Sequence, residues 1–192
     1  MRWFSYTGAM TKEFSPHRLD MKAFAQAGGR LSGHESLLKY ERLAQEAKGL
    51  HPDLLVDWQA QGEIRTDAGG VGQVWLHIKA QATLPMECQR CLMPVDVPLE
   101  LEHEFRFVAD EATAEALDDE CEEDLLALSR DFDLHEVIED ELLMAVPVVP
   151  KHDECPTVVP LASSDEDFEE ANAEKPNPFA ALAGLQKVGK EH

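Results

Sequence analysis

The chain contains 192 residues, of which 44% are hydrophobic and 29% charged, and its formal net charge is −21. This length predicts one domain with tails, and the negative charge disfavours direct, nonspecific binding to nucleic acid because it repels phosphate backbones. No apolar run approaches the roughly 18 residues that a membrane span needs, and the N-terminus lacks a secretory signal, so we expect a cytoplasmic protein.

The chain opens with a loosely patterned stretch that precedes a short helix. Met10 is as good a start as Met1, so we interpret residues 1–9 as an extension that lies outside the fold. Residues 20–29 predict a helix, for which Asp20 is the N-cap and a glycine pair is the stop.

A second helix is expected to open at Ser36 and to end at Gly49. It carries the outward-facing basic residues Lys39, Arg42 and Lys48. The N-terminal quarter is therefore the most basic part of the chain: residues 1–52 have a net charge of +3, against −6 for residues 53–110 and −18 for residues 111–192.

Alternating apolar and polar residues predict three strands in the middle of the chain. The inward-facing residues are Leu54, Val56, Trp58 and Ala60, then Val74, Leu76, Ile78, Ala80, Ala82 and Leu84, then Val95, Val97, Leu99, Leu101, Phe105 and Phe107. We predict an α+β fold in which an antiparallel, strongly twisted sheet of long hairpin strands, barrel-like in one form, packs against a few helices. His103 interrupts the apolar face of the third strand, and we interpret it as a satisfied residue rather than a ligand.

The next segment is acidic and leads into a further strand and helix. Residues 109–124 predict a surface loop or frayed helix, and residues 125–128 a short strand. Asp133 and Glu136 then have the spacing of a capping box, which predicts a helix that ends before Pro147.

A carboxylate lies on the apolar stripe of that last helix. Glu141 follows Ile138 at helical spacing, and burying it without a partner costs several kcal/mol. Arg90 can supply a bidentate partner, which would join the hairpin to the helix. In the alternative interpretation, Glu141 lies at the rim and reaches water.

These elements predict one α+β domain over residues 10–160. An acidic linker is expected over residues 161–175, followed by a C-terminal tail over residues 176–192. The tail contains Asn177 and Phe179 in a Pro-Asn-Pro-Phe sequence, and we expect it to dock on the domain or on a partner.

The cysteines predict a candidate metal site. Cys88-x-x-Cys91 and His152-x-x-Cys155 together supply three thiols and an imidazole, a set that suits tetrahedral Zn²⁺. Cys121 can replace Cys155 in such a set. The alternative is that all four cysteines are reduced thiols without a metal, since disulfides are rare in the cytoplasm.

Redox and other catalysis are disfavoured by the sequence context. A thioredoxin-type C-x-x-C opens a helix, whereas a proline and an alternating strand follow Cys91 here. No phosphate-binding glycine loop, nucleophile elbow or H-E-x-x-H sequence is present. We therefore expect a protein that is not an enzyme and has no small-molecule substrate.

Three stretches together resemble one known family. They are residues 87–92 (ECQRCL), residues 138–152 (IEDELLMAVPVVPKH) and residues 175–182 (KPNPFAAL). In this order and spacing they are similar to the YceD family of large ribosomal RNA subunit accumulation proteins, over about residues 10–190. The family pattern matches Cys88, Arg90, Cys91, Glu139, Asp140, Glu141, Pro147, Pro150, Asn177, Pro178 and Phe179. Cys121 and its acidic loop fall outside the pattern, which argues against a functional role for that thiol.

The resemblance implies a bacterial cytoplasmic factor of ribosome biogenesis that supports synthesis, processing or stability of 23S ribosomal RNA. The negative charge favours action through a basic ribosome-associated protein; the alternative is that large-subunit precursor RNA contacts only the basic N-terminal helices. The candidate contact residues are Arg90, Glu141, Asn177 and Phe179. A competing interpretation, from the cysteine pattern alone, is a zinc-clipped interaction adaptor with no ribosomal role.

Overall fold

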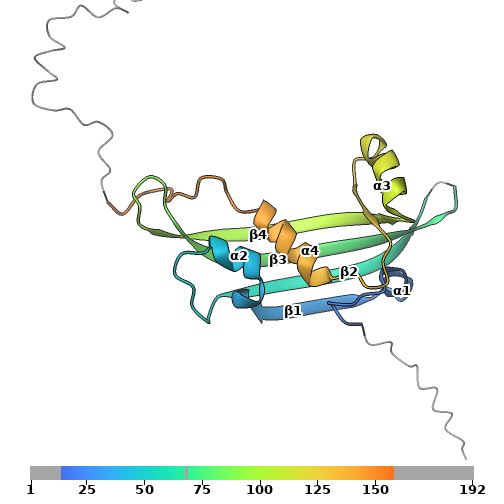
Figure 1. The fold of residues 1–192 in the computed structure, drawn as a ribbon, viewed down its shortest axis with the longest axis horizontal. Helices are drawn as coiled ribbons and strands as arrows, with labels where there is room; N and C mark the ends of the chain where they lie inside the picture. Colours follow the sequence, from blue (N-terminus) through green and yellow to red (C-terminus); the bar gives the residue numbers. More distant parts are fainter. Residues whose placement is uncertain (1–13, 68, 158–192) are drawn as a thin grey trace, which may run out of the picture. The chain divides into compact units, whose positions relative to one another are not determined.

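The computed structural model describes residues 14–67 and 69–157. The chain falls into two units, Met1–Glu154 and Cys155–His192. Among the described residues of the first unit, five strands form one sheet in the order β1-β2-β3-β4-β5 (Figure 1). They are β1 (Arg30–Ser36), β2 (Leu55–Thr66), β3 (Gly72–Glu87), β4 (Pro94–Val108) and β5 (Asp124–Ala127).

The sheet is mixed and open. Strands β1 to β4 pair as antiparallel neighbours, but β5 runs parallel to β4. A parallel pair needs a crossover, and α3 (Glu111–Leu117) with the 3₁₀ turn η2 (Asp118–Glu120) provides it. The predicted α+β class is confirmed. The predicted antiparallel pairing holds for β1 to β4 but not for β5, and the sheet is not closed into a barrel, because β1 and β5 form two separate edges.

Three helices cover one face of this sheet. They are α1 (Met21–Gln26), α2 (Glu41–Glu46) and α4 (Leu134–Met144), and Figure 1 shows α4 lying across β3 and β4. The covered face holds the alternating apolar residues of the long strands, including Val56, Leu76, Ile78, Leu84, Leu99 and Phe105, all of them buried. Period-two alternation therefore places the core between the sheet and the helices, as predicted.

Helix α1 approaches β2 closely because a glycine lies at the contact. A Cβ atom on Gly62 would lie 2.5 Å from the ring of Phe24 and 3.1 Å from Cα of Ala25. The backbone N–H of Gly62 also donates to the carbonyl oxygen of Gly29, at 2.9 Å. The missing side chain at Gly62 thus lets the end of α1 and the strand pack directly.

The predicted helices are confirmed with one change. Asp20 caps α1 by accepting from Ala23 N–H at 2.9 Å, and Asp133 caps α4 by accepting from the N–H groups of His135 and Glu136. The helix predicted from Ser36 begins instead as a 3₁₀ turn, η1 (Leu37–Lys39), before α2 starts. No helix among residues 14–67 and 69–157 is long and apolar enough to cross a membrane.

Candidate metal centre at the hairpin knuckle

The tip of the β3–β4 hairpin holds two cysteines in a tight turn, here called the hairpin knuckle (residues 87–94). Cys88 N–H donates to Met93 O at 2.9 Å, and Leu92 N–H donates to Cys88 O at 2.8 Å. Leu92 has a φ of 60°, a left-handed conformation that reverses the chain after Cys91. These bonds place both thiols at the end of the hairpin. A strand follows them rather than a helix, in agreement with the prediction against a thioredoxin-type site.

The chain that leaves α4 returns to this knuckle, and residues 147–154 are here called the return segment. Gln89 N–H donates to Pro150 O at 2.9 Å. The Arg90 guanidinium donates to the carbonyl oxygens of His152 and Asp153, at 2.8 and 3.1 Å. Hydrogen bonds from the Gln89 backbone and the Arg90 side chain therefore hold the return segment beside the two thiols.

The return segment brings a histidine against the cysteines. The ligand atoms of Cys88, Cys91 and His152 lie within 4.8 Å of one another, and His152 Nδ1 is 3.4 Å from Cys91 Sγ. His152 Nε2 is 2.9 Å from Pro94 O. Because a carbonyl oxygen only accepts, Nε2 must carry the proton, and the lone pair of Nδ1 then faces the thiols in the neutral ring.

Cys88 is fully buried, yet its surroundings favour the thiolate. The His152 backbone N–H points at Cys88 Sγ, at 3.5 Å. Burial raises the pKa of the Cys88 thiol, but hydrogen bonds from the backbone N–H groups of His152, Cys91 and Arg90 outweigh it and lower this pKa to about 5. A thiolate is the form of cysteine that ligates metals.

The remaining two cysteines differ in their relation to this group. Cys155 is the first residue of the second unit and follows His152 by three residues, so the chain keeps it within about 10 Å. Cys121 instead lies beside Arg106, whose guanidinium donates to Cys121 Sγ at 2.7 Å. Arg106 is twelve residues from Pro94 along β4, or roughly 40 Å. The prediction that Cys121 can replace Cys155 is therefore wrong.

All four cysteines belong to the described residues, and the structure joins none of them in a disulfide. Three thiols with one imidazole form a set that zinc binds, and two close-spaced pairs are the usual way in which proteins supply it. The structure thus brings together the first three predicted ligands from two segments more than sixty residues apart in sequence, and the spacing His152-x-x-Cys155 provides the fourth.

The predicted pair of Arg90 with Glu141 is replaced by two separate contacts. Arg90 binds the return segment, whereas Glu141 Oε2 lies 2.7 Å from His103 Nδ1. His103 is nine residues from Pro94 along β4, about 30 Å at the rise of a strand. The hairpin is too long for its tip to reach the middle of α4. Asn177 and Phe179 lie outside the described residues.

The motif Glu139-Asp140-Glu141 holds elements together instead. Glu139 Oε1 accepts from the backbone N–H groups of Arg42 and Leu43, at 2.7 and 3.2 Å, and its Oε2 accepts from Arg42 Nε at 3.0 Å. Asp140 forms an ion pair with the same guanidinium. Glu139 is the buried carboxylate of α4, whereas the helical spacing predicted this position for Glu141. No local signal could have revealed it, because its partner α2 is 97 residues away in sequence.

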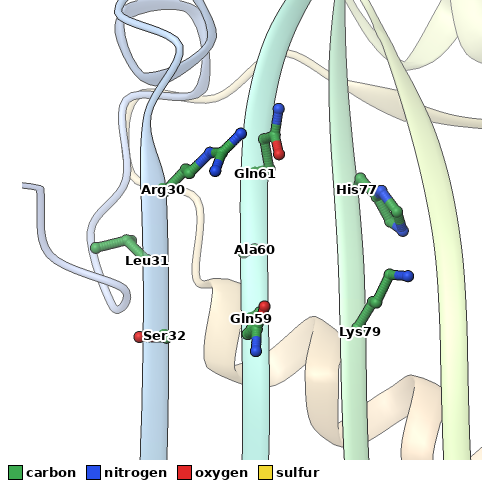
Figure 2. A pocket seen from close by; sticks show the side chains of 8 residues that line it. All are labelled: Arg30, Leu31, Ser32, Gln59, Ala60, Gln61, His77 and Lys79. Carbon is green, nitrogen blue, oxygen red and sulfur yellow. The ribbon is translucent and has the colours of Figure 1, made fainter.

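The face of the sheet opposite α4 is polar and carries a separate hollow. Figure 2 shows Arg30 and Gln61 on neighbouring strands, His77 and Lys79 on β3, and a helix behind the sheet. These residues line a pocket of about 450 Å³ that contains no cysteine. Lys79 Nζ lies 2.7 Å from the carboxylate of Glu102 on β4, and His77 Nε2 lies 3.1 Å from it. Cross-strand ion pairing accounts for His77 and Lys79, and none of the candidate metal ligands lines this pocket.

Known proteins match this chain over the part that holds the hairpin knuckle and the return segment. The family model described as "Large ribosomal RNA subunit accumulation protein YceD" matches residues 76–186. A curated relative of that name from Haemophilus influenzae is 35% identical over 114 residues, which cover 57% of this chain and 63% of the relative. The match thus spans less than two thirds of the relative's length. No solved structure matches the chain. The matched range includes the hairpin knuckle, α4 and the return segment, and the chain belongs to the YceD family of large ribosomal RNA subunit accumulation proteins.

Proposed function

We propose that this chain supports the accumulation of 23S ribosomal RNA during ribosome biogenesis in the cytoplasm. The observation that carries this proposal is membership of the YceD family, together with the 35% identical relative that is named for this role. The competing interpretation, an adaptor with no ribosomal role, is not favoured, because it rested on the cysteine pattern alone and that pattern lies within the family match.

We further propose that the chain acts by binding rather than by catalysis. The arrangement of its acidic motif supports this: Glu139 and Asp140 are committed to Arg42, and Glu141 to His103. These groups hold α4 against α2 and the sheet. Acid–base catalysis needs a titratable group that faces a substrate, and these three carboxylates face partners within the fold.

The charges favour a basic protein partner over direct contact with RNA phosphates. The chain carries a net charge of −21. Two of the three cations expected to meet RNA already have acidic partners: Lys39 Nζ lies 2.9 Å from Glu35, and Arg42 binds Glu139 and Asp140. A phosphate backbone would have to compete with these carboxylates for Lys39 and Arg42. A basic ribosome-associated protein is attracted instead by the net charge of −21.

Depletion followed by complementation tests the role. In a strain that lacks this chain, we expect the ratio of 23S to 16S ribosomal RNA to fall, and the full chain expressed in trans to restore it. Gradient sedimentation of the complemented lysate is expected to place the chain with large-subunit precursors. An unchanged ratio, with the chain only at the top of the gradient, would refute the proposal.

A further inference from the structure

We propose that Cys88, Cys91, His152 and Cys155 bind one Zn²⁺ ion as a structural Cys₃His site. This inference goes beyond the role in ribosomal RNA accumulation and does not depend on it. The first three ligands come from the hairpin knuckle and the return segment, and Cys155 comes from the residues that follow directly.

The distances match those of a zinc site. Zinc–sulfur bonds of about 2.3 Å and zinc–nitrogen bonds of about 2.0 Å place tetrahedral ligand atoms about 3.5–3.8 Å apart. Cys91 Sγ and His152 Nδ1 are 3.4 Å apart, and the ligand atoms of Cys88, Cys91 and His152 all lie within 4.8 Å of one another. The largest separation thus exceeds the tetrahedral distance by about 1 Å, which rotations of the side chains can close without movement of a strand.

The hydrogen bond on the far side of the imidazole is independent support. His152 Nε2 donates to Pro94 O at 2.9 Å, so the ring presents Nδ1 to the thiols. Histidines that ligate metals nearly always donate their other N–H to a carboxylate, a backbone carbonyl or water, which sets the tautomer and the ring orientation. A histidine that only packs beside two thiols does not require a hydrogen bond that turns its Nδ1 toward them.

The surroundings of the cysteines distinguish a structural site from a catalytic one. Cys88 is fully buried, and the backbone N–H of His152 points at its sulfur, which stabilises a thiolate ligand. A left-handed residue follows the second cysteine, at Leu92. Four protein ligands leave no coordination position open for water or substrate. Thiolates combined with imidazole in tetrahedral geometry favour zinc over magnesium, calcium or manganese, which prefer oxygen ligands.

The metal would join two parts of the fold that are distant in sequence. Cys91 and His152 are 61 residues apart, and β4, α3, β5 and α4 lie between them. Outside the site, the knuckle and the return segment share a few hydrogen bonds, chiefly those of Gln89 and Arg90. Zinc would thus hold the return segment on the hairpin.

Metal analysis of the full-length protein tests the proposal. The chain is purified under reducing conditions without chelator, and its metals are measured by plasma mass spectrometry before and after incubation with Zn²⁺. We expect about one zinc per chain, held by thiolates that a mercurial reagent displaces. A zinc content well below one after incubation, or iron in its place, would overturn the assignment.

Matched variants test the identity of the ligands. Cys155→Ser lies at the start of the second unit and is expected to leave the sheet folded, while zinc affinity falls by more than about 100-fold. Cys121→Ser removes a thiol roughly 40 Å along β4 from the site and is expected to retain full zinc. Equal affinities in these two variants would remove Cys155 from the site.

Cobalt spectroscopy of the unmutated chain tests the ligand set without relying on the folding of Cys155→Ser. Co²⁺ in the site is expected to show thiolate charge-transfer bands and the strong visible bands of tetrahedral coordination, and Zn²⁺ should displace it stoichiometrically. Weak, octahedral-type bands would contradict a site built from these ligands. Both readouts are properties of the purified protein, so they can fail or succeed independently of any effect on ribosomal RNA.

Discussion

His103 occupies the only polar position on the otherwise apolar face of β4, and two carboxylates hold it there. Glu141 of α4 lies 2.7 Å from Nδ1, Asp124 of β5 lies 2.6 Å from Nε2, and the ring stacks on Phe105. Burial lowers the pKa of His103, but the hydrogen bond and charge of Glu141 and the charge of Asp124 outweigh burial, so the pKa lies above its ordinary value. His103 therefore links α4 and β5 to β4, and these contacts are strongest when its imidazole is protonated.

This arrangement predicts a pH-dependent contribution to stability. A pKa that is raised by folding gives a contribution that is fully present below the unfolded pKa of about 6.5 and is lost as the pH rises through the folded pKa. We expect His103→Gln to lower the free energy of unfolding by about 1 kcal/mol at pH 6, and by less at pH 9. Urea titrations at both pH values measure the difference. The exposed His51→Gln serves as the control, and an effect of His103→Gln that does not change with pH would contradict the prediction.

Side-chain partners were predictable from the sequence only where both partners lie in short motifs. The cysteine pair and His152 were recognised because zinc ligands occur at close spacings, and the structure brings them together. The partner of Glu141 was predicted wrongly as Arg90, because sequence spacing does not reveal how far a long hairpin extends past a helix. The outcome for His103 agrees with the prediction that it is a satisfied residue.

At the scale of elements, α2 depends on a carboxylate supplied by α4. The side chain of Tyr40, the N-cap residue, makes no capping hydrogen bond. Glu139 of the neighbouring helix accepts instead from the part-buried N–H group of Arg42 and the buried N–H group of Leu43. A carboxylate at this position also interacts favourably with the positive end of the helix dipole. The docking of α2 on α4 is thus specified by polar groups as well as by the core residue Leu43.

We expect Glu139→Ala to destabilise the fold by about 2–4 kcal/mol, because it leaves a buried and a part-buried backbone N–H group without an acceptor. Asp140→Ala is the matched control: it removes the neighbouring carboxylate from the same guanidinium, at an exposed position, and its effect should be much smaller. Chemical denaturation of both variants measures the two losses. Equal losses would show that the ion pair with Arg42, rather than the capping of α2, is what matters.

Sustained alternation made β2, β3 and β4 predictable, and the caps at Asp20 and Asp133 made α1 and α4 predictable. Strand β1 was missed because its sequence, RLSGHES, has one large apolar residue, as suits a mostly polar edge strand. The direction of β5 could not be predicted from its own sequence. A run of apolar residues indicates a strand, but only the crossover through α3 makes that strand parallel to β4.

At the scale of the whole molecule, the sheet has one covered apolar face and one polar face, and the net charge is strongly negative. The sheet can stay open because the helices on one side already bury its apolar face. Closure into a barrel is not needed to remove that face from water. Sequence alternation predicts that one face is buried, but it does not state whether a helix layer or barrel closure covers it.

The charge predicts that the purified chain does not bind precursor ribosomal RNA tightly without a partner. Filter binding at low and physiological salt measures this, and addition of a basic ribosomal fraction is expected to bring RNA and chain together. Tight binding of RNA by the chain alone, with affinity falling steeply as salt rises, would contradict the protein-partner proposal, since that slope reports phosphate contacts.

The separation of the two ligand pairs also has a consequence during synthesis. Cys91 leaves the ribosome 61 residues before His152, which at roughly 5–20 residues per second is a delay of about 3–12 seconds. In that interval the hairpin can form and its two thiols can hold zinc only incompletely. In the proposed site, the remaining ligands would reach the metal only after α4 has docked and the return segment has reached the knuckle. If the proposed site binds zinc, retention of the metal would distinguish a chain that has finished translation and folding from one that stops within the acidic segment or α4.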